Sequence, residues 1–88
     1  MKIKKGFILR DVAGEKIIVA TGDAASSFNG IINLNDTGAF IFSCLSKHNL
    51  TEDELAEKVA AEYGIDKESA KRDFAGFLDT LRKASCLE

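Results

Sequence analysis

FNGIINLNDTGA, residues 28–39, contains the point at which a strand pattern changes into a helix pattern. An Asn-Gly dipeptide near its start marks a turn, and the short apolar run that follows predicts a strand over residues 31–34. Asn35 or Asp36 can cap a helix, because their side-chain oxygens accept hydrogen bonds from first-turn N–H groups. Gly38 lacks a Cβ, so we expect this helix to approach the strand closely.

Two further strands are predicted upstream of this stretch. Residues 6–12, GFILRDV, mix apolar and charged positions as a half-buried strand does, and residues 16–21 include the β-branched run Ile-Ile-Val. A short Ala-Gly-Glu turn at residues 13–15 joins them into a hairpin. Residues 22–29 are rich in Gly, Ser, Ala and Asp. They are expected to form a loop that Phe28 anchors.

Two helices are expected within residues 35–64. Apolar side chains occur on nearly all sides of the first, which is typical of a helix deep in a core. The second begins at TEDE, residues 51–54, where the Thr51 hydroxyl and the Glu54 carboxylate can satisfy backbone donors reciprocally. Gly64 ends this helix, and its carboxylates are expected to form a solvated face. Its buried stripe is predicted to consist of Leu55, Val59 and Tyr63.

A third and longest helix is capped by Asp66 and is expected to run to about Ala84. Its charges are nearly balanced. Three strands followed by three helices predict one α+β domain over residues 1–88, in which a three-stranded antiparallel sheet packs beside the helices as in a winged helix-turn-helix. The buried side of the third helix is predicted to consist of Ala70, Phe74, Phe77, Leu78 and Leu81.

Charge and hydropathy narrow the range of partners. The formal net charge is −2, which argues against nucleic acid because duplex binding depends on neutralising phosphates. No stretch has the roughly 20 apolar residues of a membrane span, and no signal-peptide pattern follows the N-terminal lysines. Cys44 and Cys86 lie far apart and are expected to be buried thiols in a reducing compartment. We therefore expect a cytoplasmic protein.

Patterns typical of catalysis and of metal binding are missing. One histidine, His48, and two distant cysteines cannot supply the paired ligands of a structural zinc site. No glycine-rich phosphate loop occurs. A pair of His48 with Cys44 or Cys86 is disfavoured as a nucleophilic centre, because one thiol lies on an apolar helix and the other near the chain end. We expect no catalytic residue, no metal and no cofactor, and hence a binding protein.

The stretch of residues 28–39 belongs to a longer pattern. Together with LRD at residues 9–11 and the ending LxxLRKAxxL at residues 78–87, it resembles the PqqD family, which comprises pyrroloquinoline quinone synthesis protein D and related RiPP recognition elements. LNDTG, residues 34–38, is the most specific part, and the resemblance covers essentially the whole chain. Phe42 stands where relatives often have tryptophan. Ser85 stands where they often have glycine, so a frayed or extended helix end is expected.

This resemblance implies a non-catalytic peptide chaperone. Such proteins bind the leader segment of a ribosomally made precursor peptide and present it to a modifying enzyme, commonly a radical S-adenosylmethionine enzyme. The leader would add as a strand beside the third strand and rest in a groove formed with the third helix. Alternation should direct one of Ile31 and Ile32 into the core. The implied contacts are Gly30, Ile31, Ile32, Asn33 and Leu34 on the strand, and Lys71, Phe74, Phe77, Leu78 and Leu81 on the helix.

Each helix contact also has a plainer interpretation: the apolar residues can be core, and Lys71 a solvated charge. Two alternative functions stay open as well. The order of elements also suits a DNA-binding winged helix, whose third helix would enter the major groove. A free edge strand can also pair with a second copy of the chain, which would make the protein a homodimer or a structural module.

Overall fold

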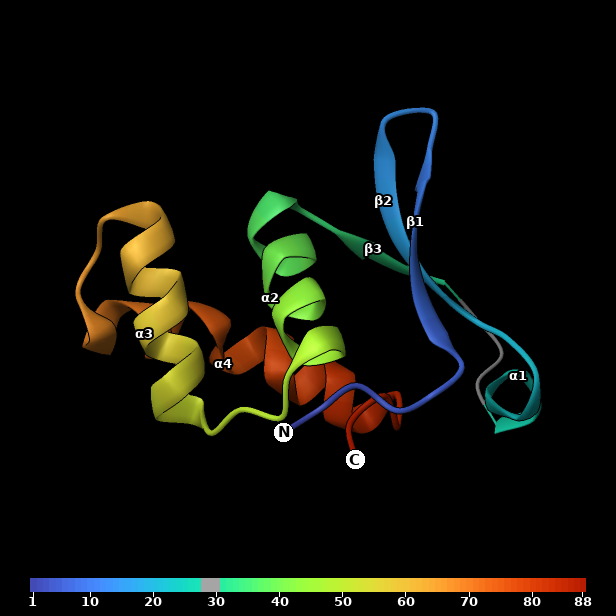
Figure 1. Ribbon diagram of the computed structural model, residues 1–88. Helices are drawn as coiled ribbons and strands as arrows, with labels where there is room; N and C mark the ends of the chain where they lie inside the picture. Colours follow the sequence, from blue (N-terminus) through green and yellow to red (C-terminus); the bar gives the residue numbers. More distant parts are fainter. Residues whose placement is uncertain (28–30) are drawn as a thin grey trace.

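A computed structural model of the chain describes residues 1–27 and 31–88. The strands form one antiparallel sheet in the order β1-β2-β3. In Figure 1, α2 stands between the sheet and α3, and α4 runs from beneath α3 past α2 toward the sheet. The elements are β1 (Phe7–Val12), β2 (Glu15–Ala20), α1 (Asp23–Ser27), β3 (Ile32–Leu34), α2 (Asp36–Lys47), α3 (Glu52–Tyr63) and α4 (Lys67–Lys83).

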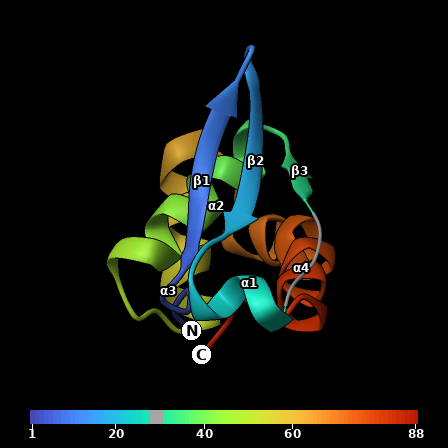
Figure 2. The same cartoon turned by 90° about the vertical axis from the view of Figure 1, so that its right-hand side faces the viewer.

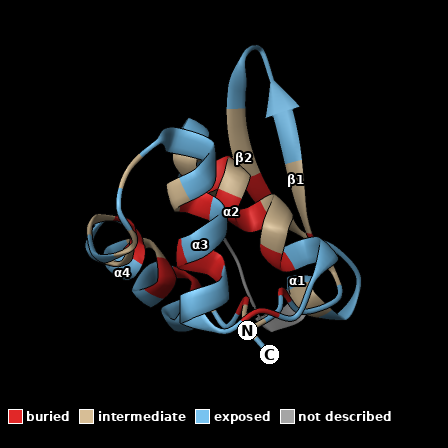
Figure 3. Cartoon of the chain, turned by 60° about the vertical axis from the view of Figure 1, so that its left-hand side comes forward, coloured by how far each residue is buried: buried red, intermediate tan, exposed pale blue. Residues whose placement is uncertain are grey.

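The predicted hairpin is confirmed, with a two-residue turn at Ala13 and Gly14. Their φ angles are 54° and 83°, the positive values that a type I′ turn requires. The Gly14 N–H donates to Asp11 Oδ1 at 3.1 Å, which supports the turn. Only Ile18 of β2 is fully buried, and the tip of the hairpin is exposed (Figure 3).

The prediction of a loop over residues 22–29 is wrong in its first part, where the chain forms α1. Alanine favours the helix, and Asp23 in the first turn complements its dipole. The Ala24 N–H donates to Thr21 O at 3.2 Å and starts the turn. The described residues therefore contain four helices. The predicted anchor Phe28 and the Asn-Gly turn lie outside the described residues.

Side chains from the sheet and the three long helices form one core. The predicted stripe of α3 is confirmed for Leu55 and Val59, but Tyr63 is 41% exposed. Its ring makes an edge contact with Phe40, at a centroid distance of 5.8 Å. None of the described helices is long and apolar enough to cross a membrane. The largest fully buried side chains are those of Phe42, Ile18, Ile41, Leu45, Leu55, Leu78, Leu81, Val59 and Cys86.

The two ends of the chain lie side by side (Figure 1). Ile3 bridges to Leu87, and the Lys4 N–H donates to Cys86 O at 2.7 Å. Ser85 takes a positive φ of 59°, and the Cys86 N–H donates to Leu81 O at 2.9 Å. These bonds close the end of α4, so the expectation of a frayed or extended end is wrong. Cys86 is buried as predicted, whereas Cys44 is only half-buried.

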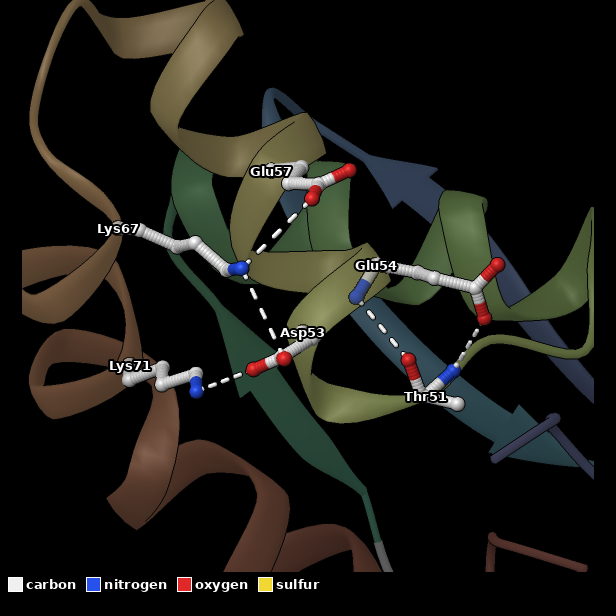
Figure 4. Close-up of polar contacts among 6 residues, drawn as sticks. All are labelled: Thr51, Asp53, Glu54, Glu57, Lys67 and Lys71. Carbon is white, nitrogen blue, oxygen red and sulfur yellow. Dashed lines mark hydrogen bonds and ion pairs between the residues drawn. The ribbon is translucent and has the colours of Figure 1, made fainter.

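Both predicted caps on the helix-turn-helix half are confirmed. The Glu54 N–H donates to Thr51 Oγ1 at 3.1 Å while Glu54 Oε1 accepts from the Thr51 N–H at 2.9 Å (Figure 4). Asp66 Oδ1 accepts from the Ser69 N–H at 2.7 Å at the start of α4. These hydrogen bonds stabilise the charged form of each carboxylate and lower the pKa of Glu54 and of Asp66.

The acidic face of α3 is not simply solvated as predicted, because ion pairs tie it to α4. Lys67 Nζ lies 3.7 Å from Asp53 Oδ2 and 3.6 Å from Glu57 Oε1. Lys71 Nζ pairs with the other oxygen of Asp53 (Figure 4). The hydrogen bond from Lys71, and the charges of Lys67 and Lys71, lower the pKa of Asp53. These exposed pairs link α3 and α4 at the surface, whereas the packing of the two helices rests on their shared core.

The unfolding free energy is expected to fall as the pH is lowered from about 5 to about 2. The pKa values of Asp53, Glu54 and Asp66 are lowered in the folded protein. In this window the unfolded chain therefore binds protons more readily, and acid favours unfolding. Urea titrations at several pH values measure the effect. Asp66→Asn keeps a good cap but cannot titrate, so its stability should fall less; a wild-type midpoint independent of pH would contradict the prediction.

Candidate functional site: the cleft between β3 and α4

β3 forms one edge of the sheet. Its three residues pair with β2, Ile18 opposite Ile32 and Lys16 opposite Leu34, and no other described strand pairs with it. The free edge thus offers backbone N–H and C=O groups to a further strand. Ile31, just before β3, is 64% exposed, whereas Ile32 packs against the core. The sequence left open which of these two isoleucines faces the core. In the structure Ile32 faces inward and Ile31 outward.

A cleft of about 140 Å³ lies between β3, the start of α2 and α4. Figure 2 shows β3 passing above α4 at this place. We call it the β3–α4 cleft. Its lining consists of Asn33, Leu34, Asn35, Thr37, Gly38, Ile41, Asp73, Phe74 and Phe77.

Gly38 allows the three walls of the cleft to meet, as its lack of a Cβ predicted. A Cβ built on Gly38 would lie 3.4 Å from Leu34 Cδ2 and 3.4 Å from Phe77 Cε1. Both distances are at the lower limit of ordinary van der Waals contact, so a Cβ would just fit and a longer side chain would meet Leu34 and Phe77. Leu34 and Phe77 thus flank Gly38 in the cleft, and we call this apolar part of its lining the floor.

Polar groups at the start of α2 form one rim of the cleft. Of the two residues predicted to cap this helix, Asn35 is the N-cap of α2, since its Oδ1 accepts a hydrogen bond from the Gly38 N–H at 2.7 Å. Asp36 stands in the first turn, and its carboxylate lies 3.6 Å from Lys16 Nζ. Thr37 is half-buried and lines the cleft. The orphan N–H groups and the dipole of α2 are thus already partly complemented by this chain's own side chains.

The predicted contacts on the third helix separate into three groups. Phe77 is half-buried and lines the cleft. Phe74 also reaches the cleft but is 2% exposed, and Leu78 and Leu81 are core residues with exposures of 1% and 0%. Lys71 lies on the side of α4 that faces α3, where Asp53 holds it. The structure thus brings Phe77 and Phe74 to β3 but not Lys71, Leu78 or Leu81; Gly30 lies outside the described residues.

Two residues of α4 for which the sequence predicted no role belong to the same side of the helix as Phe77. Asp73 lines the cleft. Gly76 is exposed, and a Cβ built on it would meet no atom within 4 Å outside its own helix. Asp73, Gly76, Phe77 and Thr80 follow the spacing i, i+3, i+4, i+7 of one helix face. This spacing, counted from Phe77, could have identified Asp73 and Gly76 from the sequence.

Comparisons with known proteins show the family and the fold. The family model described as coenzyme PQQ synthesis protein D (PqqD) matches residues 9–87. The fold is similar to that of TbiB1 in complex with the TbiA(beta) leader peptide, with a TM-score of 0.74, 24% sequence identity and coverage of 100% of this chain and 95% of that chain. It is also similar to lasso peptide synthetase B1 complexed with the leader peptide, with a TM-score of 0.67, 20% identity and coverage of 93% and 89%. Among curated protein sequences none matches this chain.

Proposed function

This chain belongs to the PqqD family, and we propose on that premise that it binds the leader segment of a ribosomally made precursor peptide. The leader adds as a strand to the free edge of β3, and its side chains enter the β3–α4 cleft. Binding brings the precursor to a modifying enzyme, such as a radical S-adenosylmethionine enzyme, and the chain itself catalyses no reaction. The single observation that carries the proposal is an open strand edge beside a cleft with an apolar floor.

Physical reasons connect this geometry with a peptide rather than a small molecule. Small-molecule pockets commonly measure about 300–1,000 Å³, and the β3–α4 cleft has about 140 Å³. That volume suits one side chain. In strand addition the backbone hydrogen bonds provide affinity and pockets for alternate side chains provide specificity. The two similar structures were solved with leader peptides bound, which supports the same class of ligand here.

The DNA-binding alternative has no support in these comparisons. Two lysines near the start of α4, Lys67 and Lys71, are already paired with carboxylates of α3. A helix that enters a groove needs such cations free for phosphates. Pairing of two copies through β3, the other alternative, would use the same edge and therefore compete with the leader.

An amide NMR titration tests the proposal. The ligand is the leader segment of a short precursor peptide encoded beside the gene, and duplex DNA of the same concentration is the control. We expect shifts concentrated on β3, the first turn of α2 and the side of α4 that carries Phe77, and no shifts with DNA. Light scattering during the titration separates leader binding from dimer formation. Salt-sensitive shifts with DNA alone would contradict the proposal.

Replacing Gly76 by Ala should stabilise the free protein but weaken leader binding. Glycine within a helix costs about 0.5–1 kcal/mol relative to alanine, and a Cβ at Gly76 would meet open space. No packing in the described residues therefore accounts for this glycine. Close approach of a bound backbone to α4 would account for it, and the added Cβ would obstruct that approach. Urea unfolding and calorimetric titration measure the two effects.

The neighbouring residue provides a matched control. Ala75 is exposed and lies outside the i, i+3, i+4, i+7 face that contains Gly76. Ala75→Gly should therefore lower stability by about 0.5–1 kcal/mol and leave affinity unchanged. If Gly76→Ala stabilised the protein and bound the leader with full affinity, the peptide would not pass over this part of α4.

A further inference from the structure

We infer that the β3–α4 cleft selects a basic side chain of the bound peptide, a lysine or an arginine, through the carboxylate of Asp73. This inference rests on the proposed function and names the chemistry that the cleft would recognise. Asp73 is the one charged residue among those that line the cleft. It is exposed, and no ion pair is found for it within the described part of the chain.

In the described part of the chain, the neighbouring cations contact groups other than Asp73. Lys71 pairs with Asp53 on α3. Arg72 Nη2 lies 3.5 Å from Ser69 Oγ, one turn back along α4. On β2, Lys16 pairs with Asp36. The carboxylate of Asp73 is thus available to a cation supplied by a ligand.

The positive end of the α2 dipole faces the same cleft and could favour an anion instead. That end is already complemented, however, by the hydrogen bond from the Gly38 N–H to Asn35 Oδ1 and by Asp36 in the first turn. The remaining polar atoms on the rim are acceptors as well as donors, namely the side chains of Asn33 and Thr37. Among the described residues that line the cleft, the full charge is therefore negative.

The shape of the cleft also suits a long basic side chain. Lysine and arginine bury their apolar stems while they keep the charged group in a polar setting. Here the stem would rest on the floor of Leu34 and Phe77, and the charged group would reach Asp73, one helical turn from Phe77. The aromatic face of Phe77 would add a favourable interaction with the cation. The cleft volume of about 140 Å³ is close to that of an engineered cavity of about 150 Å³ that holds one benzene. The cleft is therefore large enough for the stem of one such side chain.

Selection from a random 12-residue peptide display library tests this inference. The proteins compared are the wild type, Asp73→Asn and Asp73→Lys. Wild-type protein should enrich peptides with lysine or arginine at one aligned position. Asp73→Asn should lose that preference and bind the wild-type peptides about fivefold more weakly, since an exposed ion pair contributes up to about 1 kcal/mol. Asp73→Lys should prefer aspartate or glutamate at the same position.

Asp79→Asn is the matched control, because Asp79 is an exposed aspartate of the same helix whose carboxylate lies 3.0 Å from Lys83 Nζ. It should select the same peptides as the wild type. Peptides enriched without a basic position, or an unchanged preference in Asp73→Asn, would contradict this inference and leave the proposed function standing. Failure of the wild-type protein to enrich any peptide would contradict both.

Discussion

A proline introduced at one of two neighbouring positions of β3 is expected to reduce leader binding at least tenfold while the protein stays folded. Successive backbone N–H groups of a strand point to opposite edges. Of Ile32 and Asn33, one therefore donates toward β2 and the other toward the free edge. Proline removes the donor, and its ring obstructs the approach of a partner strand. A tenfold loss corresponds to about 1.4 kcal/mol, in the range of one hydrogen bond plus the steric effect.

The two variants, Ile32→Pro and Asn33→Pro, should behave differently in the free protein. The variant that loses a donor toward β2 should be less stable in urea, because β3 is only three residues long. The other should keep its stability and lose only the ligand. Ile32→Val and Asn33→Ala change the same side chains but keep the N–H, so they should retain leader binding. Full affinity in both proline variants, each shown to be folded by circular dichroism, would rule out strand addition at β3.

Phe77→Ala should weaken leader binding by about one to two orders of magnitude, because the ring provides much of the apolar floor that a leader side chain would cover. Fully burying an exposed apolar side chain of the leader against this ring is worth about 1.5–3 kcal/mol. Since Phe77 is only half-buried, the loss should appear mainly in affinity. Phe77→Leu keeps much of the apolar surface and should therefore retain part of the affinity that Phe77→Ala loses. Calorimetric titration of the folded variants provides the measurement.

Leu81→Ala, in the same helix, should have the opposite effect to Phe77→Ala: it should lower stability and not affinity. Leu81 is 0% exposed, and truncation of a buried leucine costs about 2–5 kcal/mol of stability. A small domain has about 5–15 kcal/mol in total, so the unfolding midpoint should fall sharply. Where the variant is still folded its affinity should be unchanged. A Phe77→Ala protein that bound normally, or a folded Leu81→Ala protein that did not bind, would contradict this assignment of roles.

Local patterns in the sequence predicted most of the elements. The hairpin turn needs positive φ at two adjacent residues, of which Gly14 adopts it freely and Ala13 at some cost. Likewise the caps at Asn35, Thr51 and Asp66 are local hydrogen bonds. The short α1 was missed because a five-residue helix has almost no periodicity to detect.

Residues of α4 show where local patterns were insufficient. Periodicity predicted that Phe74, Phe77, Leu78 and Leu81 share one apolar side, and they do. It could not show that Phe77 alone of the four stays partly exposed, because that depends on how β3 and α4 approach each other around Gly38. For the same reason the sequence did not separate Asp73, which faces β3, from Lys71, which faces α3.

The sequence by itself thus determined the order of the strands and long helices, their caps, and the family to which the chain belongs. These properties depend on residues close together in the chain, so a linear pattern contains them. Only the tertiary structure decided which side of α4 meets the sheet edge, and hence which residues line the β3–α4 cleft. A helix face acquires its role from the element packed against it, and that element lies about forty residues away in the sequence of this chain.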